Sequence, residues 1–180
     1  MTRYRAVTTC ADWRNIAKLY KKAFPLSERK PLFMMRSKCK QDKADAWIIE
    51  EEGQFVGFAI TMNAKDLVML DYFAVTEKAR GNGYGSACLR WLQKQYKDSR
   101  FFLEIESIHV KAKNMEQRLG RKAFYERNGM SGAGVNAKVF GVEFECLGYG
   151  CKLEFEEYKA LYRSCYGRFI GWNVKSVKIK

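Results

Sequence analysis

A glycine-rich stretch at residues 80–86 has the residue types that could hold a phosphate group. It runs Arg-Gly-Asn-Gly-Tyr-Gly-Ser and lies between an apolar stretch ending at Val75 and a helix expected over residues 83–96. Glycine has no Cβ, so successive backbone N–H groups in such a loop can approach an anion closely. The N-terminus of the following helix would add the positive end of its dipole. The stretch therefore predicts a diphosphate-binding site.

Other phosphate-binding motifs compete for the same stretch. A P-loop requires Gly-x-x-x-x-Gly-Lys-Ser/Thr, which the sequence does not contain. A dinucleotide fingerprint requires Gly-x-Gly-x-x-Gly/Ala directly after a strand. Gly81 and Gly83 match its first half, but Ser86 stands at the third position and residues 76–80 separate the strand from the first glycine. Glu104 lies at a suitable distance downstream, so spacing alone leaves the dinucleotide interpretation open beside that of an ordinary flexible loop.

A second candidate segment is the helix expected over residues 114–128. Arg118, Arg121 and Tyr125 share one face of it at positions i, i+3 and i+7. A tyrosine phenol has a reference pKa of about 10, so at neutral pH it is protonated and can donate a proton. Residues typical of helix ends lie on both sides of this segment. Asn114 is a candidate N-cap, and Gln117 is placed for a capping box. Gly129 suits the left-handed position that ends a helix.

The apolar periodicity predicts one mixed α+β domain over residues 1–180, with a strand-rich centre. The expected strands are 3–7, two within 45–62 around a turn at 51–54, 67–75, 101–106, 135–142 and 143–149. The expected helices are 12–24, 31–40, 83–96, 114–128 and 156–165.

Residues 80–85 resemble the Arg/Gln-x-x-Gly-x-Gly/Ala motif of the GNAT N-acetyltransferase superfamily. The context resembles the family too, because the apolar strand ending Tyr-Phe-Ala-Val at residue 75 precedes the motif and a helix follows Ser86. Residues 118–130 resemble the family's second cofactor-contacting helix, which commonly ends Phe-Tyr-x-x-x-Gly-Phe and here ends with Met130. The resemblance covers about residues 45–129 and weakens towards both ends.

This resemblance implies a fold, a co-substrate and a set of contacts. The fold would be a central mixed, mostly antiparallel sheet, splayed at the cofactor site and with helices on both faces. The co-substrate would be acetyl-CoA, without a metal, and it would transfer its acetyl group directly to a primary amine in a ternary complex. The residues implied in cofactor binding are Phe73, Ala74, Val75, Arg80, Gly81, Asn82, Gly83, Tyr84, Gly85, Ser86 and Asn114. Helix capping explains Asn114 equally well.

The resemblance also implies catalytic roles. Tyr125 would protonate the CoA thiolate as it leaves. The attacking amine must be neutral, so a carboxylate acting directly or through water would help. The candidates are Asp71, which shares a strand face with Phe73 and Val75, and Glu104 or Glu106 on the next strand. Water alone could also serve, leaving no dedicated base.

Two further residue types could take part in nucleophilic chemistry. His109 is the only histidine, and no Gly-x-Ser-x-Gly elbow accompanies it, so we interpret it as a surface or loop residue. Cys88 lies on an apolar helix stripe and is most simply a core residue, which favours direct transfer over an acetyl-cysteine intermediate.

The composition limits the partners and the compartment. The 33 Lys and Arg against 20 Asp and Glu give a net charge of +13, which favours an anionic partner. No Cys-x-x-Cys pair, signal peptide or membrane-length apolar run is visible, so we expect reduced thiols, a cytoplasmic protein and no membrane partner. A nucleic-acid partner is not expected, because no recognised nucleic-acid motif is present. The alternative functions are a non-catalytic acetyl-CoA-binding module and a nucleic-acid or ribosome-binding module. The acceptor and the oligomeric state cannot be read from the sequence, and a dimer is compatible with it.

Overall fold

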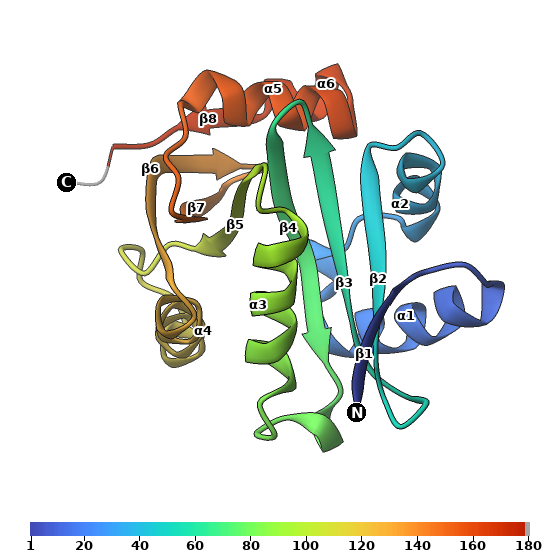
Figure 1. Cartoon of the computed structure of the whole chain (residues 1–180). Coiled ribbons are helices and arrows are strands. Elements are labelled where there is room, and N and C mark those ends of the chain that lie inside the picture. The colour runs from blue at the N-terminus through green and yellow to red at the C-terminus, as the bar shows by residue number, and fades with distance from the viewer. Residues whose placement is uncertain (179–180) are drawn as a thin grey trace. The chain divides into compact units, whose positions relative to one another are not determined.

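The computed structural model describes residues 1–178, which form both strands and helices (Figure 1). The strands in these residues are β1 (Thr2–Ala6), β2 (Ala44–Glu51), β3 (Gln54–Ala64), β4 (Leu67–Val75), β5 (Arg100–Glu106), β6 (Met130–Val139), β7 (Val142–Tyr149) and β8 (Val174–Ser176). The α-helices are α1 (Cys10–Ala23), α2 (Leu32–Cys39), α3 (Tyr84–Gln95), α4 (Met115–Arg127), α5 (Phe155–Tyr166) and α6 (Arg168–Trp172). Two 3-10 turns are η1 (Leu26–Glu28) and η2 (Glu77–Ala79).

The chain divides into two compact units. The first consists of Met1–Met62 and Leu70–Leu92, and the second of Asn63–Met69 and the chain from Gln93 onwards. The strand order is β1-β2-β3-β4 in the first unit and β5-β7-β6-β8 in the second. The pairings of β1 with β2, β2 with β3, β5 with β7, and β6 with both β7 and β8 are antiparallel.

Helices cover both faces of the first unit's strands (Figure 1). On one face, the Tyr20 ring of α1 packs edge-on against Tyr72 of β4, with ring centres 4.9 Å apart. On the other face, Trp91 of α3 stacks on Tyr4 of β1 at 4.9 Å and meets Trp47 of β2 edge-on at the same distance. These contacts follow from side-chain alternation, because successive residues of a strand point to opposite faces.

The N-terminus of α1 is capped by a reciprocal pair. The Thr9 hydroxyl accepts the N–H of Asp12, and the Asp12 carboxylate accepts the N–H of Thr9. Arg5 of β1 then pairs with the same carboxylate at 2.7 Å and with Glu50 of β2 at 2.7 Å. The cap therefore fixes where α1 begins and also attaches the helix to the edge strand β1 and to its neighbour β2.

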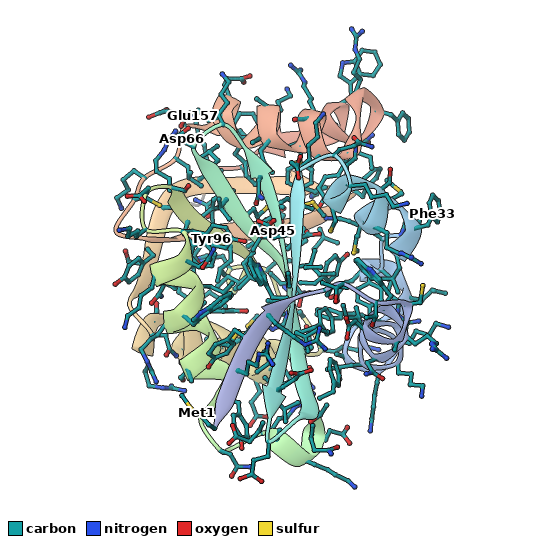
Figure 2. The ribbon with its side chains drawn as sticks, turned by 45° about the vertical axis from the view of Figure 1, so that its right-hand side comes forward. Met1, Phe33, Asp45, Asp66, Tyr96 and Glu157 are labelled. Carbon is teal, nitrogen blue, oxygen red and sulfur yellow. The ribbon has the colours of Figure 1, made fainter. Side chains whose placement is uncertain are left out.

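In the second unit, α5 lies over β5. Tyr158 packs against Phe102 with ring centres 6.4 Å apart. Arg100, the first residue of β5, forms ion pairs at 2.7 Å with Asp66 and with Glu157 of α5. Figure 2 shows Asp66 and Glu157 next to each other where Arg100 joins them. These pairs hold the start of α5 beside the start of β5.

The predicted mixed α+β class is confirmed, and the strand from Leu67 to Val75 has the predicted bounds. Three details were wrong. The turn of the β6–β7 hairpin occupies Phe140 and Gly141, both at positive φ, inside the strand expected over 135–142. The α6 helix and β8 were not expected. Asn114 occupies the N-cap position of α4, but its side chain forms no cap hydrogen bond.

The described helices fall short of the length and apolar content that a bilayer span requires. Within the same residues, no cluster of three or more His, Cys, Asp or Glu side chains could hold a metal ion.

Candidate functional site

The glycine-rich loop joins β4 to α3 in the first unit. After β4 the chain makes the η2 turn and then passes through Gly81 and Gly83, whose φ angles are +81° and +79°. Residues with a Cβ rarely adopt this conformation, which accounts for glycine at both positions. A Cβ built on either glycine would meet no protein atom within 4 Å. The backbone of the loop is therefore accessible on the side where these glycines lack a side chain.

The first turn of α3 supplies N–H groups that point out of the helix end. The N–H of Ala87 donates to the carbonyl oxygen of Gly83 at 2.9 Å. The amides of Tyr84, Gly85 and Ser86 precede this bond, and the first amides of an α-helix have no acceptor within the helix. The positive end of the helix dipole adds to them. Residues 81–86 thus have backbone conformations compatible with the anion-binding loop that the sequence predicts, and anion binding itself stays a prediction.

The charged side chains beside the loop are mainly basic. Arg80 is exposed, and its Nε donates to the Val75 carbonyl oxygen at 3.4 Å. Glu77 is the acidic residue of the η2 turn, and it pairs with Lys22 of α1 at 2.7 Å. The hydrogen bond from Lys22 lowers the pKa of Glu77. The nearest carboxylate is therefore already partnered, which leaves the loop suited to an anion.

The end of β4 leads directly into the loop. Asp71, Phe73 and Val75 are half-buried and alternate with the buried Tyr72 and Ala74, which agrees with the shared face expected for the first three. On β3, Gly57 lies against this segment. A Cβ on Gly57 would approach the Ala74 carbonyl oxygen to 2.6 Å, so only glycine allows the two strands to pass so closely.

Asp71 forms an ion pair that the sequence did not predict. Its carboxylate lies 2.7 Å from the Lys30 ammonium, and its side chain is only 6% exposed. Lys30 also lies 5.6 Å from the centre of the Tyr72 ring. The backbone of Lys30 is held by the Tyr20 hydroxyl, which accepts its N–H at 2.8 Å and donates to its carbonyl oxygen at 3.1 Å. Asp71 would have to exchange this cation for an acceptor amine before it could act as a base.

Tyr125 lies in the second unit, on α4. The residue is half-buried, and its ring packs at 67° against Phe124 with ring centres 5.2 Å apart. Burial raises the pKa of Tyr125 to about 12, and the nearby charge of Arg121 opposes this rise. The phenol therefore keeps its proton at neutral pH, as a proton donor requires.

A buried carboxylate organises the start of α4. Glu106, at the end of β5, accepts from Arg118 at 2.6 Å and from the Asn114 side-chain amide at 3.3 Å, and it lies 3.5 Å from Arg121. The side-chain oxygen of Asn114, Oδ1, accepts from Arg118 Nε at 3.0 Å. The expected capping role of Asn114 is thus replaced by a bridge between Glu106 and Arg118. The expected basic face of Arg118 and Arg121 is partly offset by the same carboxylate.

The remaining sequence candidates have defined surroundings. Glu104 of β5 accepts the Tyr162 hydroxyl of α5, which lies 2.8 Å from both carboxylate oxygens. His109 is exposed, as expected of a loop residue, and Cys88 is fully buried, as expected of a core residue. Lys30 and Tyr162 were missed in the sequence because they lie 41 and 58 residues from their partners, and no local pattern marks such pairs.

Each unit also contains a hollow apart from these residues. That of the first unit, about 390 Å³, lies between the β1–α1 loop, α2 and β2, and that of the second, about 310 Å³, lies beside His109 and Asn136. No predicted site residue lines either hollow. The candidate residues of the first unit are therefore the loop, the end of β4 and Asp71, and those of the second unit are Tyr125, Asn114 and Glu104.

Comparison with known proteins identifies a family. Residues 13–130 match the model of the acetyltransferase (GNAT) family. A structure assigned to a GNAT-family acetyltransferase from Bacteroides thetaiotaomicron is 21% identical, with a TM-score of 0.75, covering 92% of this chain and 99% of that chain. The ribosomal-protein alanine N-acetyltransferase of Escherichia coli is 18% identical, with a TM-score of 0.60, and the match covers 86% and 96% of the two chains.

An aminoglycoside 6'-N-acetyltransferase, solved in complex with coenzyme A, is 13% identical, with a TM-score of 0.65, covering 81% of this chain and 95% of that chain. At these identities the likeness concerns the fold. No curated protein sequence matches the chain.

Proposed function

Since the chain belongs to the GNAT acetyltransferase family, we propose that it moves the acetyl group of acetyl-CoA to a primary amine, directly and within a ternary complex. The observation that carries the proposal is the loop at residues 81–86. It combines two glycines at positive φ, a helix N-terminus and a basic surrounding, which together suit the diphosphate of CoA. The coenzyme A complex of the aminoglycoside acetyltransferase supports the same choice of co-substrate.

Tyr125 is the proposed proton donor. The amine nitrogen bonds to the thioester carbon to give a tetrahedral intermediate. As this intermediate collapses, the carbon–sulfur bond breaks and the departing thiolate takes the phenolic proton of Tyr125. The resulting tyrosinate then regains a proton from solvent. A phenol at its ordinary pKa of about 10 is already protonated at neutral pH, and burial raises the pKa of Tyr125 further, to about 12. Main-chain N–H groups at the end of β4, around Phe73 and Val75, are the proposed donors to the oxyanion that forms on the acetyl carbon.

Water is the proposed acceptor of the amine's proton, because Asp71 and Glu104 already hold partners. Direct transfer is proposed over a covalent acetyl-enzyme. Cys88 lies within α3 and is fully buried. Burial raises the pKa of its thiol, so little reactive thiolate forms there.

Two measurements test the proposal. Acetyl-CoA is expected to raise the melting temperature, because a ligand that binds the native state stabilises it by mass action, whereas NAD is not. Turnover is then measured with a panel of amines by mass spectrometry of the acetylated product, since the exposed Cys10 would react with thiol reagents used to detect free CoA. Stabilisation by NAD alone would favour the dinucleotide interpretation. Stabilisation by acetyl-CoA without turnover on any amine would favour a non-catalytic binding module.

A further inference from the structure

Aromatic side chains project from the surface at the end of the second unit. Phe169 and Trp172 of α6 are 73% and 78% exposed and lie three residues apart, which places them on one side of the helix. Phe140, in the β6–β7 turn, is 57% exposed. The β6–β8 register pairs Val139 with Val174, so the Phe140 turn adjoins the residues that follow α6. A group of three exposed rings is uncommon unless the surface has a partner.

The helix that carries two of these rings is fixed in place. A five-residue helix is not stable alone. Here Gly171 packs directly against Arg163 of α5, and a side chain at Gly171 would collide with it. The following strand, β8, pairs with β6. Phe169 and Trp172 are thus presented on a preformed support, which reduces the entropy that a partner must overcome on binding.

Two lysines lie on the strands next to the Phe140 turn. Lys138 of β6 and Lys175 of β8 are directly opposite each other in the antiparallel register. Like charges in this arrangement are destabilising, and Glu143, 3.1 Å from Lys138, offsets only one of the two. From Tyr158 to the C-terminus, every charged residue of the sequence is Lys or Arg. An anionic partner would relieve the repulsion between the two lysines.

We propose that this basic aromatic surface, formed by Phe140, Phe169, Trp172, Lys138, Arg168 and Lys175, binds single-stranded nucleic acid. Phosphates would contact the lysines and Arg168, and bases would stack on the exposed rings, as in other single-strand-binding sites. The sequence alone argued against this partner for want of a motif, and the exposure of the α6 rings is what the structure adds. The five-residue α6 is too small for the broad apolar face with which interfacial helices enter a membrane.

Binding is measured by fluorescence anisotropy with labelled oligouridine and oligothymidine over a range of salt concentrations. The wild-type protein is expected to bind both, with affinity that falls as salt rises. Trp172→Ala should weaken binding about tenfold, which is within the range for losing one stacked base. Trp172→Phe keeps an aromatic ring and should restore most of the affinity. Lys175→Glu should weaken binding and make the salt dependence shallower, because a phosphate contact is lost.

Matched controls lie in the first unit. Phe33 of α2 is also 73% exposed and points into solvent (Figure 2), so Phe33→Ala removes an equally exposed ring elsewhere. Lys18→Glu, on an exposed position of α1, changes the net charge by the same amount as Lys175→Glu. Both controls should bind like the wild type. The Trp172 variants should retain the wild-type circular dichroism and melting temperature, because this side chain is exposed. Lys175→Glu should keep the wild-type circular dichroism and melt at the wild-type temperature or above it, because it removes the repulsion with Lys138.

Two comparison ligands separate the sources of affinity. Polyphosphate offers charge without bases, and its binding should be weaker and unaffected by Trp172→Ala. Vesicles of anionic phospholipid should not bind in a Trp172-dependent way. The proposal is overturned if Trp172→Ala and Phe33→Ala affect oligouridine binding equally, if polyphosphate binds as tightly as the oligonucleotides, or if Trp172 is needed for vesicles and not for nucleic acid.

Discussion

Replacing Gly83 by alanine separates the conformational role of the loop from its role in binding. Gly83 has a φ of +79°, and a Cβ there would meet no protein atom within 4 Å. The cost to folding is therefore the left-handed conformation alone, about 1–2 kcal/mol for a residue with a Cβ. In a protein of this size 1 kcal/mol shifts the melting temperature by about 2–4 °C, so Gly83→Ala should lower it by about 2–8 °C. A typical stability of about 5–15 kcal/mol leaves the variant folded.

The effect of Gly83→Ala on binding should be larger than its effect on folding. The new methyl group would occupy the side from which the diphosphate approaches the loop amides. Losing one hydrogen bond to a charged group costs about 1.5–3 kcal/mol, which corresponds to a loss of affinity of about 10- to 150-fold. Isothermal titration calorimetry with acetyl-CoA measures this directly.

Gly120→Ala is the matched control. Gly120 lies inside α4, and a Cβ there also meets no protein atom within 4 Å. Alanine in a helix interior is about 0.5–1 kcal/mol more favourable than glycine, so this variant should melt higher and bind acetyl-CoA unchanged. If Gly83→Ala binds acetyl-CoA with wild-type affinity, the loop does not hold the diphosphate. If both variants lose affinity equally, the loss has another origin.

The remaining predictions concern titratable residues. Tyr125→Phe should lower kcat about 100-fold with little change in the KM of acetyl-CoA, and wild-type turnover by this variant in steady-state kinetics would refute the donor role. The pKa of Tyr125 is about 12 in the folded protein and about 10 in the unfolded chain. The contribution of its protonated form to stability should therefore be complete below pH 10 and should disappear between about pH 10 and 12. Urea titrations of wild type and Tyr125→Phe over this pH range measure it. Asp12→Asn should lower the free energy of unfolding in urea by about 2 kcal/mol at pH 7, since it removes a charged hydrogen bond to Arg5. Arg5 lowers the pKa of Asp12 below its ordinary value of 3.8, so the difference in stability between wild type and variant should shrink as the pH falls below 3.8. A difference that does not change with pH would contradict the pairing. Asp71→Asn should lower kcat less than about tenfold at saturating substrates because Lys30 holds its carboxylate, and a loss of the size expected for a positioned base, about 100-fold or more, would identify Asp71 as that base.

Local signals explain which parts of the fold could be predicted from sequence. The strand at 67–75 and the loop after it are marked by an apolar run and by glycines that the backbone conformation requires. By contrast, α6 has only five residues, too few for a periodic pattern. The β6–β7 turn was placed inside a strand because Phe140, an aromatic residue typical of strands, occupies a positive-φ position there.

The candidate site residues also differ in whether the nearby sequence is enough to recognise them. The backbone conformation of the proposed anion-binding loop depends on a few consecutive residues, so its glycines could be singled out from the sequence. The function of a carboxylate depends instead on its partners. Asp71 is paired with Lys30, which is 41 residues away, and Asn114 takes part in a bridge to Glu106 where a helix cap was equally plausible from sequence. These partners can be recognised only when the fold brings them together.

The carboxylates of the site also bear on how an acceptor amine loses its proton. A general base must accept a proton at the moment of attack, so a carboxylate already held by a cation or a hydroxyl is a weaker base than a free one. Asp71 is held by Lys30, Glu104 by Tyr162, and Glu106 by Arg118. Proton transfer through any of these carboxylates would therefore break an established contact. Solvent water carries no such cost, and this is the argument for proposing water as the acceptor of the amine's proton.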